Sequence, residues 1–220
     1  MSNTEMKMIP CPKCNHENEM RIFKTVNATT DPQFRENLLN GSLFNFKCVD
    51  CGYEAVMKYP LLYNDMKNRL MVYYIPDNDR TELVDKELEE EYAEIGAITR
   101  RLAGSFNTVK EKIHIFESGL DDRAIELTKL AVSEIVAKKT EDNINNGFFS
   151  IYNRDKKIIG FTFFVGENNE QYVQTTRLEI YEKSADIVKA VDGGSTDSTA
   201  FLTIDRAWAE NVLYRYKKGL

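Results

Sequence analysis

The residues best suited to chemistry in this chain are its four cysteines, which form two pairs of identical spacing. Cys11 and Cys14 enclose Pro-Lys, and Cys48 and Cys51 enclose Val-Asp. A Cys-x-x-Cys pair can direct both thiolates at one ion, and two such pairs supply the four thiolates of a tetrahedral structural zinc site. The sequence therefore predicts one zinc ion held by Cys11, Cys14, Cys48 and Cys51.

The residue after each pair suits the turn that this spacing requires. That position often needs a left-handed backbone, which glycine adopts without strain and asparagine tolerates better than most residues. Gly52 follows the second pair and Asn15 follows the first. Four thiolates would also close the coordination sphere and leave no position for a catalytic water, so the zinc is expected to be structural.

Three other roles for the cysteines stay open at this point. Disulfides are typical of oxidising compartments. A redox dithiol of the thioredoxin type uses one pair beside a βαβ unit, whereas two pairs lie here in a strand-rich segment. Four thiolates could also hold iron. Metal content and thiol titration distinguish these roles from structural zinc.

The segment that carries the cysteines, residues 9–76, also contains all five prolines and is interpreted as a zinc-ribbon-like antiparallel sheet with one inserted helix. Strands are expected over residues 19–28, 44–47, 53–59 and 70–75. The inserted helix is expected over residues 31–39, because Asp31 suits the N-cap, Pro32 the first helical position and Gly41 the position past the end. This helix accounts for the 33 residues, 15–47, between the two pairs.

The remaining segments have different patterns. Residues 1–8 are expected to be a disordered lead, and residues 77–141 to be mainly helical. Residues 142–220 are interpreted as a C-terminal α/β region with strands at 148–152 and 158–165. This order of strands, helices, strands and helices indicates the α+β class. The first helix of the middle segment is predicted from a stripe of apolar residues: Val84, Leu88, Tyr92, Ile95 and Leu102.

Four stretches of this chain, in this order and spacing, resemble the CpXC family, bacterial and archaeal proteins named for the Cys-Pro-x-Cys motif. They are CPKC at 11–14, DPQFRENLLNGSLFNFKCVDCGY at 31–53, YPLLYNDMKNRLMVYYIP at 59–76 and RRLAGSFNTVKEKIHIFESGLDDRAIELTKL at 100–130. The resemblance covers about residues 9–135 and implies a CpXC-like domain over residues 9–141. The family has no established biochemical activity, so the resemblance supports the zinc site and assigns no catalytic residue.

Charge limits the classes of partner. The net charge is −6. Lys and Arg against Asp and Glu number 9 and 8 in residues 1–76, 10 and 16 in residues 77–141, and 10 and 11 in residues 142–220. Proteins that bind nucleic acid through its phosphates usually carry a Lys/Arg-rich face. No segment is strongly basic, so a protein partner or self-association is expected in preference to nucleic acid.

The expected cellular location rests on two patterns that the sequence lacks, a membrane-spanning apolar run and a secretory signal. No run approaches the roughly 18 apolar residues that a membrane helix needs. The first residues, MSNTEMKM, contain no apolar stretch typical of a secretory signal. The chain is therefore expected to be a cytoplasmic protein without a membrane segment.

Other motifs have simpler interpretations. Residues 191–199, VDGGSTDST, resemble a nucleotide-sugar-binding stretch of family-2 glycosyltransferases, but they follow a helical pattern and have turn composition. His114 is expected to face outward from a strand, and His16 is redundant beside four cysteines. A group of tyrosines could stack on a ligand, although core packing is more common: Tyr59, Tyr63, Tyr73 and Tyr74.

The sequence analysis therefore leaves three hypotheses for function. The first is a zinc-binding module that binds or scaffolds other proteins, without enzymatic activity. The second is a zinc-ribbon protein associated with nucleic acid, against which the acidic balance counts. The third is an enzyme of unknown class.

Overall fold

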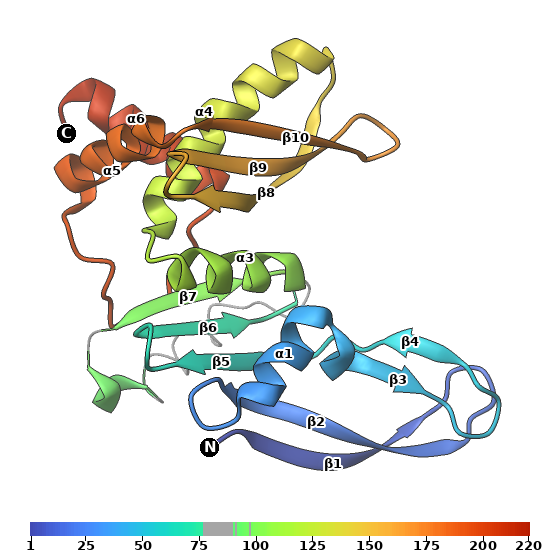
Figure 1. Cartoon of the computed structure of the whole chain (residues 1–220). Coiled ribbons are helices and arrows are strands. Elements are labelled where there is room, and N and C mark those ends of the chain that lie inside the picture. Colours follow the sequence, from blue (N-terminus) through green and yellow to red (C-terminus); the bar gives the residue numbers. More distant parts are fainter. Residues whose placement is uncertain (77–89, 91, 97) are drawn as a thin grey trace. The chain divides into compact units, whose positions relative to one another are not determined.

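The structure is a computed structural model that describes residues 1–76, 90, 92–96 and 98–220 (Figure 1). The chain divides into two compact units, Met1–Lys110 with Asp197–Leu202, and Glu111–Thr196 with Thr203–Leu220. The mixture of helices and strands confirms the α+β class. The predicted boundary between residues 141 and 142 concerns the extent of the CpXC-like domain and stays a prediction.

The first unit contains two sheets. One has five strands in the order β1-β2-β5-β6-β7, and the other pairs β3 with β4. Its elements are β1 (Asn3–Pro10), β2 (Glu17–Asn27), α1 (Pro32–Asn40), η1 (Ser42–Phe44), β3 (Asn45–Lys47), β4 (Glu54–Val56), β5 (Leu61–Asp65), β6 (Leu70–Tyr74), η3 (Ala93–Ile95) and β7 (Thr99–Ala103). The larger sheet is mixed, because β2 with β5 and β6 with β7 are parallel pairs. The predicted antiparallel pairing holds for β1 with β2, β3 with β4 and β5 with β6, and the two parallel pairs were not predicted.

The expected disordered lead was wrong. Strand β1 pairs antiparallel with β2 along its whole length. Met6 and Met8 of β1 are exposed, so the strand has no alternating buried side chains. Its pairing rests on backbone hydrogen bonds, which a hydrophobic pattern does not reveal.

Strand β2 and helix α1 confirm the local predictions. Along β2, Met20 and Ile22 are buried, and they pack in one cluster with Phe46 of β3 and with Cys11 and Cys48. Burial of one face in this way is what stabilises a short ribbon.

Helix α1 begins after Asp31 and ends before Gly41, as predicted. Gly41 has φ 83° and donates its N–H to Leu38 O. Asp31 makes no side-chain cap, however, because its carboxylate accepts the Ser2 N–H at 2.7 Å. The N-terminal strand and the start of α1 are thereby joined.

Part of the predicted middle helix is a strand. Leu102 lies in β7, at the edge of the five-stranded sheet, and not on the apolar stripe of a helix. Val84 and Leu88 lie outside the described residues. The edge is extended by the segment Asp197–Leu202, since Leu202 accepts from Leu102 N at 3.0 Å. Arg100, fully buried, fixes this region by donating to Tyr92 O at 2.7 Å.

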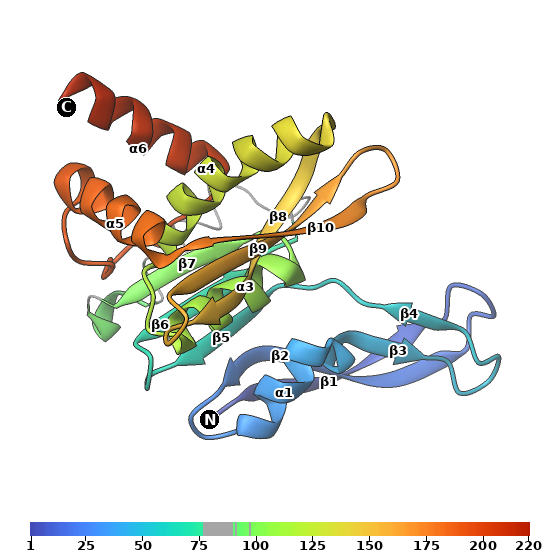
Figure 2. The same cartoon turned by 45° about the horizontal axis from the view of Figure 1, so that its top comes forward.

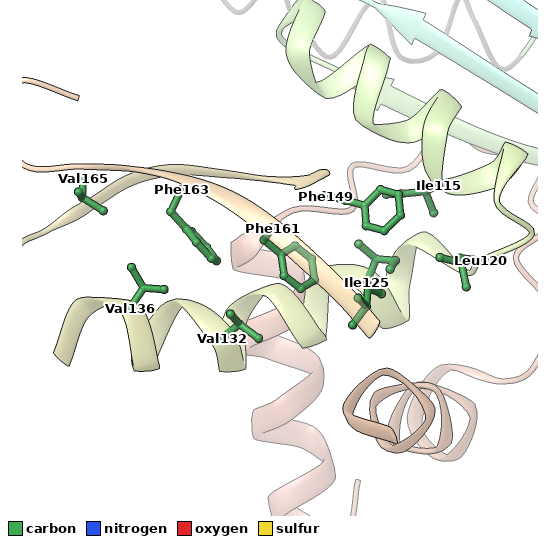
Figure 3. Close-up of a cluster of buried hydrophobic side chains, with 10 residues drawn as sticks. Ile115, Leu120, Ile125, Val132, Val136, Phe149, Phe161, Phe163 and Val165 are labelled. Atoms are coloured by element: carbon green, nitrogen blue, oxygen red, sulfur yellow. The ribbon is translucent and has the colours of Figure 1, made fainter. Parts of the chain in front are cut away.

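The second unit packs helices on one face of a three-stranded antiparallel sheet, β10-β9-β8. Its elements are α3 (Phe106–Glu117), which begins in the first unit, α4 (Asp122–Thr140), β8 (Ile144–Asn153), β9 (Ile158–Val165), β10 (Glu170–Arg177), α5 (Leu178–Asp192) and α6 (Arg206–Lys218). Phe161 and Phe163 of β9 point toward Val132 and Val136 of α4 (Figure 3). Figure 2 shows α5 and α6 beside α4.

Two groups of buried charges lie within this unit. The Lys112 ammonium donates to Asp122 at 2.7 Å and to Ile204 O at 2.9 Å, and both side chains are at most 1% exposed. Lys129 contacts Glu111 at 3.0 Å and Glu126 at 2.8 Å. Within the described ranges, no helix combines the length and apolarity needed to cross a bilayer.

Candidate metal centre

The structure brings the two cysteine pairs together at one end of the first unit. Cys11 and Cys14 lie in the turn between β1 and β2, and Cys48 and Cys51 lie in the turn between β3 and β4 (Figure 1). All four sulfur atoms lie within 4.8 Å of one another. Among the described residues no other group of three or more His, Cys, Asp or Glu side chains gathers in this way.

Both turns have the same backbone construction. In the first, Cys11 N donates to His16 O at 2.9 Å and Asn15 N to Cys11 O at 2.8 Å. In the second, Cys48 N donates to Tyr53 O at 2.8 Å and Gly52 N to Cys48 O at 3.0 Å.

The two residues predicted to adopt a left-handed backbone do so. Asn15 has φ 60° and Gly52 has φ 70°. The turn chemistry expected from the sequence is therefore confirmed at both pairs.

The distances between sulfur atoms fit a shared ion. The Cys11 and Cys51 sulfurs are 3.6 Å apart, and so are the Cys14 and Cys48 sulfurs. A tetrahedral ion with metal–sulfur bonds of about 2.3 Å separates its ligands by about 3.8 Å. A disulfide needs about 2.05 Å, so these thiols are not bonded in pairs. The donor set and its spacing could hold one metal ion.

A buried asparagine joins the two turns, and sequence reasoning missed it. Asn18 is 4% exposed, and its Nδ2 donates to His16 O at 2.7 Å and to the Cys48 sulfur at 3.6 Å. Its Oδ1 accepts from Val49 N at 2.9 Å. One side chain therefore holds the first turn, the second turn and one sulfur in a fixed arrangement. Its position four residues after Cys14 was the only available signal.

The cluster also shifts the pKa values of two of its thiols, Cys48 and Cys14. The backbone N–H of Cys51, followed by that of Asp50, lowers the pKa of Cys48 to about 6. At Cys14 the backbone of His16 acts to lower the pKa, but burial and the three neighbouring thiols raise it to about 12. Four thiolates this close repel one another without a cation, and a bound metal ion removes that penalty.

The comparison with known families agrees with this geometry. The family model described as CpXC protein matches residues 9–129, more than half of the chain. The chain belongs to the CpXC family. The match contains both cysteine pairs, β2 to β7, α3 and the beginning of α4. Searches of the curated proteins and of the solved structures gave no match.

The two histidine side chains of this CpXC chain do not join the cluster of four cysteines. His114, expected on a strand, lies exposed on helix α3. The apolar–polar alternation Ile113-His114-Ile115 suggested a strand, but both isoleucines are buried from a helix. His16 is exposed and contributes its backbone carbonyl to the turn.

Three of the four tyrosines pack against phenylalanine rings, and the fourth is buried. Tyr59 and Tyr74 pack against Phe44, whereas Tyr73 packs against Phe201. Tyr63 is fully buried. Their positions agree with the packing interpretation.

The stretch 191–199 does not form a strand-and-loop nucleotide site. It begins at the end of α5, and Ser198 N donates to Ile98 O at 2.8 Å. Asp197 pairs with Arg69 at 2.8 Å. The stretch therefore attaches to the edge of the first unit's sheet.

Proposed function

We propose that Cys11, Cys14, Cys48 and Cys51 hold one structural zinc ion and that the chain acts as a non-enzymatic binding or scaffold module. The observation that carries this proposal is the convergence of four sulfur atoms from two turns within 4.8 Å. Four thiolates complete the tetrahedron of a zinc ion, so a substrate or a catalytic water has no open position.

Zinc is favoured over the other roles by chemistry. Zinc binds a given ligand set more tightly than ferrous iron does. The 3.6 Å contacts join sulfurs of different Cys-x-x-Cys pairs, which one shared ion explains better than a redox dithiol within a single pair. Four free thiols also suit a reducing compartment such as the cytoplasm.

A protein is the favoured partner because the charge of the chain disfavours nucleic acid. The net charge is −6, and no segment is strongly basic. Phosphate binding would need a basic face and would weaken steeply with salt.

Elemental mass spectrometry of the purified full chain tests the metal, with light scattering on the same sample. About one zinc per chain is expected, and Cys11→Ser or Cys51→Ser should lose it. Val49→Ser is the matched control, because this residue lies in the second turn with 81% of its surface exposed. Stoichiometric iron, or four titratable thiols in folded metal-free protein, would contradict the zinc assignment.

The binding role is tested by native affinity purification of the tagged full chain. A partner protein that stays bound in moderate salt, or a concentration-dependent oligomer, would support it. Recovery of nucleic acid released by moderate salt would favour the alternative role.

A further inference from the structure

A groove beside the metal centre is not used by the proposed zinc site. It has a volume of about 440 Å³ and is lined by residues of β1, β2, α1, η1 and β3. Its apolar lining includes Phe23, Phe34, Leu43 and Phe46. This volume falls in the range of ligand-binding pockets in proteins.

The groove has polar connections at both ends. At one end the Tyr59 hydroxyl donates to Leu43 O at 3.4 Å. At the other end Asn18 of β2 accepts the N–H of Val49. The second of these bonds joins β2 to the residues that follow β3.

Between these ends the edge of β2 is open. Strand β5 pairs with β2 only at Thr25–Asn27, and β1 occupies the opposite side. Backbone groups alternate in direction along a strand. The register with β1 is unbroken from Phe23 to Glu17, so every second residue of this stretch directs its backbone groups away from β1. Glu19 and Arg21 lie two residues apart, share one direction, and both line the groove.

The facing strand is open as well. Strand β3 pairs with β4 on one side, and on its other side no strand of the described part of the chain joins it. Natural proteins usually cover or interrupt a long free edge, because it presents unpaired N–H and C=O groups. Neither β2 nor β3 contains a proline that would block such an edge.

We infer that this groove binds an extended peptide segment of a partner protein, which adds a short strand to the edge of β2. The inference deepens the proposed binding function and rests on it. Backbone bonds to Arg21 and Glu19 would supply affinity, as in other cases of strand addition. An apolar side chain of the peptide would contact Phe23, Phe34 and Leu43.

Length and charge define the peptide further. The edge from Asn18 to Phe23 spans about 17 Å, enough for four or five extended residues. Arg21, Lys47 and Glu19 line the groove, and Lys47 is already paired with Glu54 at 2.7 Å. Arg21 is exposed and forms no ion pair within the described residues. The favoured segment therefore carries an acidic residue next to its apolar anchor.

A displayed library of random peptides of about eight residues, selected against the zinc-loaded full chain, tests this inference. Affinities of the selected peptides are then measured by fluorescence anisotropy. Arg21→Pro removes an N–H from the groove edge. Met8→Pro is the matched control, because Met8 pairs with Glu19, and when Glu19 faces the groove its partner in an antiparallel ladder faces the opposite edge of the ribbon.

The inference predicts that Arg21→Pro weakens binding about tenfold or more, while Met8→Pro changes it less than about threefold. Arg21→Ala keeps the N–H and should weaken mainly the acidic peptides. Zinc content and circular dichroism check that each variant is folded. Hydrogen exchange on the unmodified chain needs no variant, and bound peptide should slow exchange at residues 19–21.

Several results would overturn the inference. They are selection of no peptide, equal losses in both proline variants, absence of protection at residues 19–21, or a dimer that Arg21→Pro abolishes. Capture of a partner that Arg21→Pro leaves unchanged would refute the groove and leave the binding function intact. Loss of zinc stoichiometry in the unmodified chain would instead refute the proposed metal site.

Discussion

Replacement of Asn18 by aspartate tests the hydrogen bonds that this side chain donates, because the two side chains have nearly the same size and shape. The substitution keeps the shape and the oxygen that accepts from Val49 N. It removes the two donations from Nδ2, to His16 O and to the Cys48 sulfur, and it places a negative charge against that thiolate. We expect Asn18→Asp to weaken zinc binding while the fold is retained when zinc is in excess.

The expected loss of zinc affinity depends on which of the two lost hydrogen bonds involves a metal ligand. The bond to His16 O exists with or without zinc, so its loss, about 1 kcal/mol, lowers folding stability more than zinc affinity. The bond to the Cys48 sulfur involves a charged acceptor and contributes about 1.5–3 kcal/mol. This loss alone corresponds to about 10–100-fold in affinity, the range typical of residues that orient metal ligands. Charge repulsion makes the effect larger, so about 100-fold is expected.

The assay is competition for zinc between the protein and a chromophoric chelator at neutral pH. Asn45→Asp is the matched control, because Asn45 is exposed, lies three residues before Cys48 and gains the same charge. The reasoning would be refuted if Asn18→Asp stayed within about threefold of the unmodified chain, or if both variants lost the same affinity.

Three further predictions concern metal removal and the buried charges. Chelation of zinc should lower the unfolding temperature seen by circular dichroism but leave the emission of Trp208, the single tryptophan, unchanged, because Trp208 packs in the second unit. Lys112→Met should cost about 3–5 kcal/mol in urea unfolding followed by Trp208 emission, and adding Asp122→Leu should recover most of that loss. Lys129→Met should destabilise most at neutral pH and less as the pH falls, since burial raises the pKa of Glu126 and protonation relieves the uncompensated charge.

The controls for the buried charges lie on the same helix. Lys138 is exposed on α4, so Lys138→Met should change stability by less than about 0.5 kcal/mol. A loss for Lys112→Met below about 1 kcal/mol, or a double variant as unstable as the sum of both single variants, would contradict the buried ion pair. A deficit of Lys129→Met that grows on acidification would contradict the raised pKa of Glu126.

The ion pairs of Lys129 also predict how stability changes at high pH. Burial acts to lower the pKa of Lys129, but Glu111 and Glu126 outweigh it and raise this pKa to about 12. A base with a raised pKa in the folded state stabilises the fold at pH values below its ordinary pKa. That contribution is lost as the pH rises toward about 12.

Local chemistry made the clustering of the four cysteines predictable. The spacing of the cysteines, Asn15 and Gly52 after them, and Pro32 and Gly41 around α1 each reflect a constraint within a few residues. Such constraints act wherever the segment lies in the fold. Hence the four cysteines and the inserted helix were placed correctly without knowledge of the sheet.

Features that depend on distant partners were not predictable. Strand β1 has exposed methionines and exists because β2 supplies its hydrogen bonds. Leu102 fits a helical stripe by spacing, yet β6 and the segment Asp197–Leu202 make its surroundings a sheet. Arg100 is charged in sequence but fully buried in the fold, where backbone carbonyls accept hydrogen bonds from its terminal guanidinium nitrogens.

Asn18 connects the proposed metal site with the inferred groove. The same side chain fixes Val49 and the Cys48 sulfur and lies at the end of the free edge of β2. If zinc holds β3 opposite β2, the metal also sets the width of the groove. Linkage then requires reciprocity, because a peptide that binds the zinc-loaded form more tightly must raise zinc affinity by the same factor. A closed metal site can therefore influence partner binding without contacting the partner.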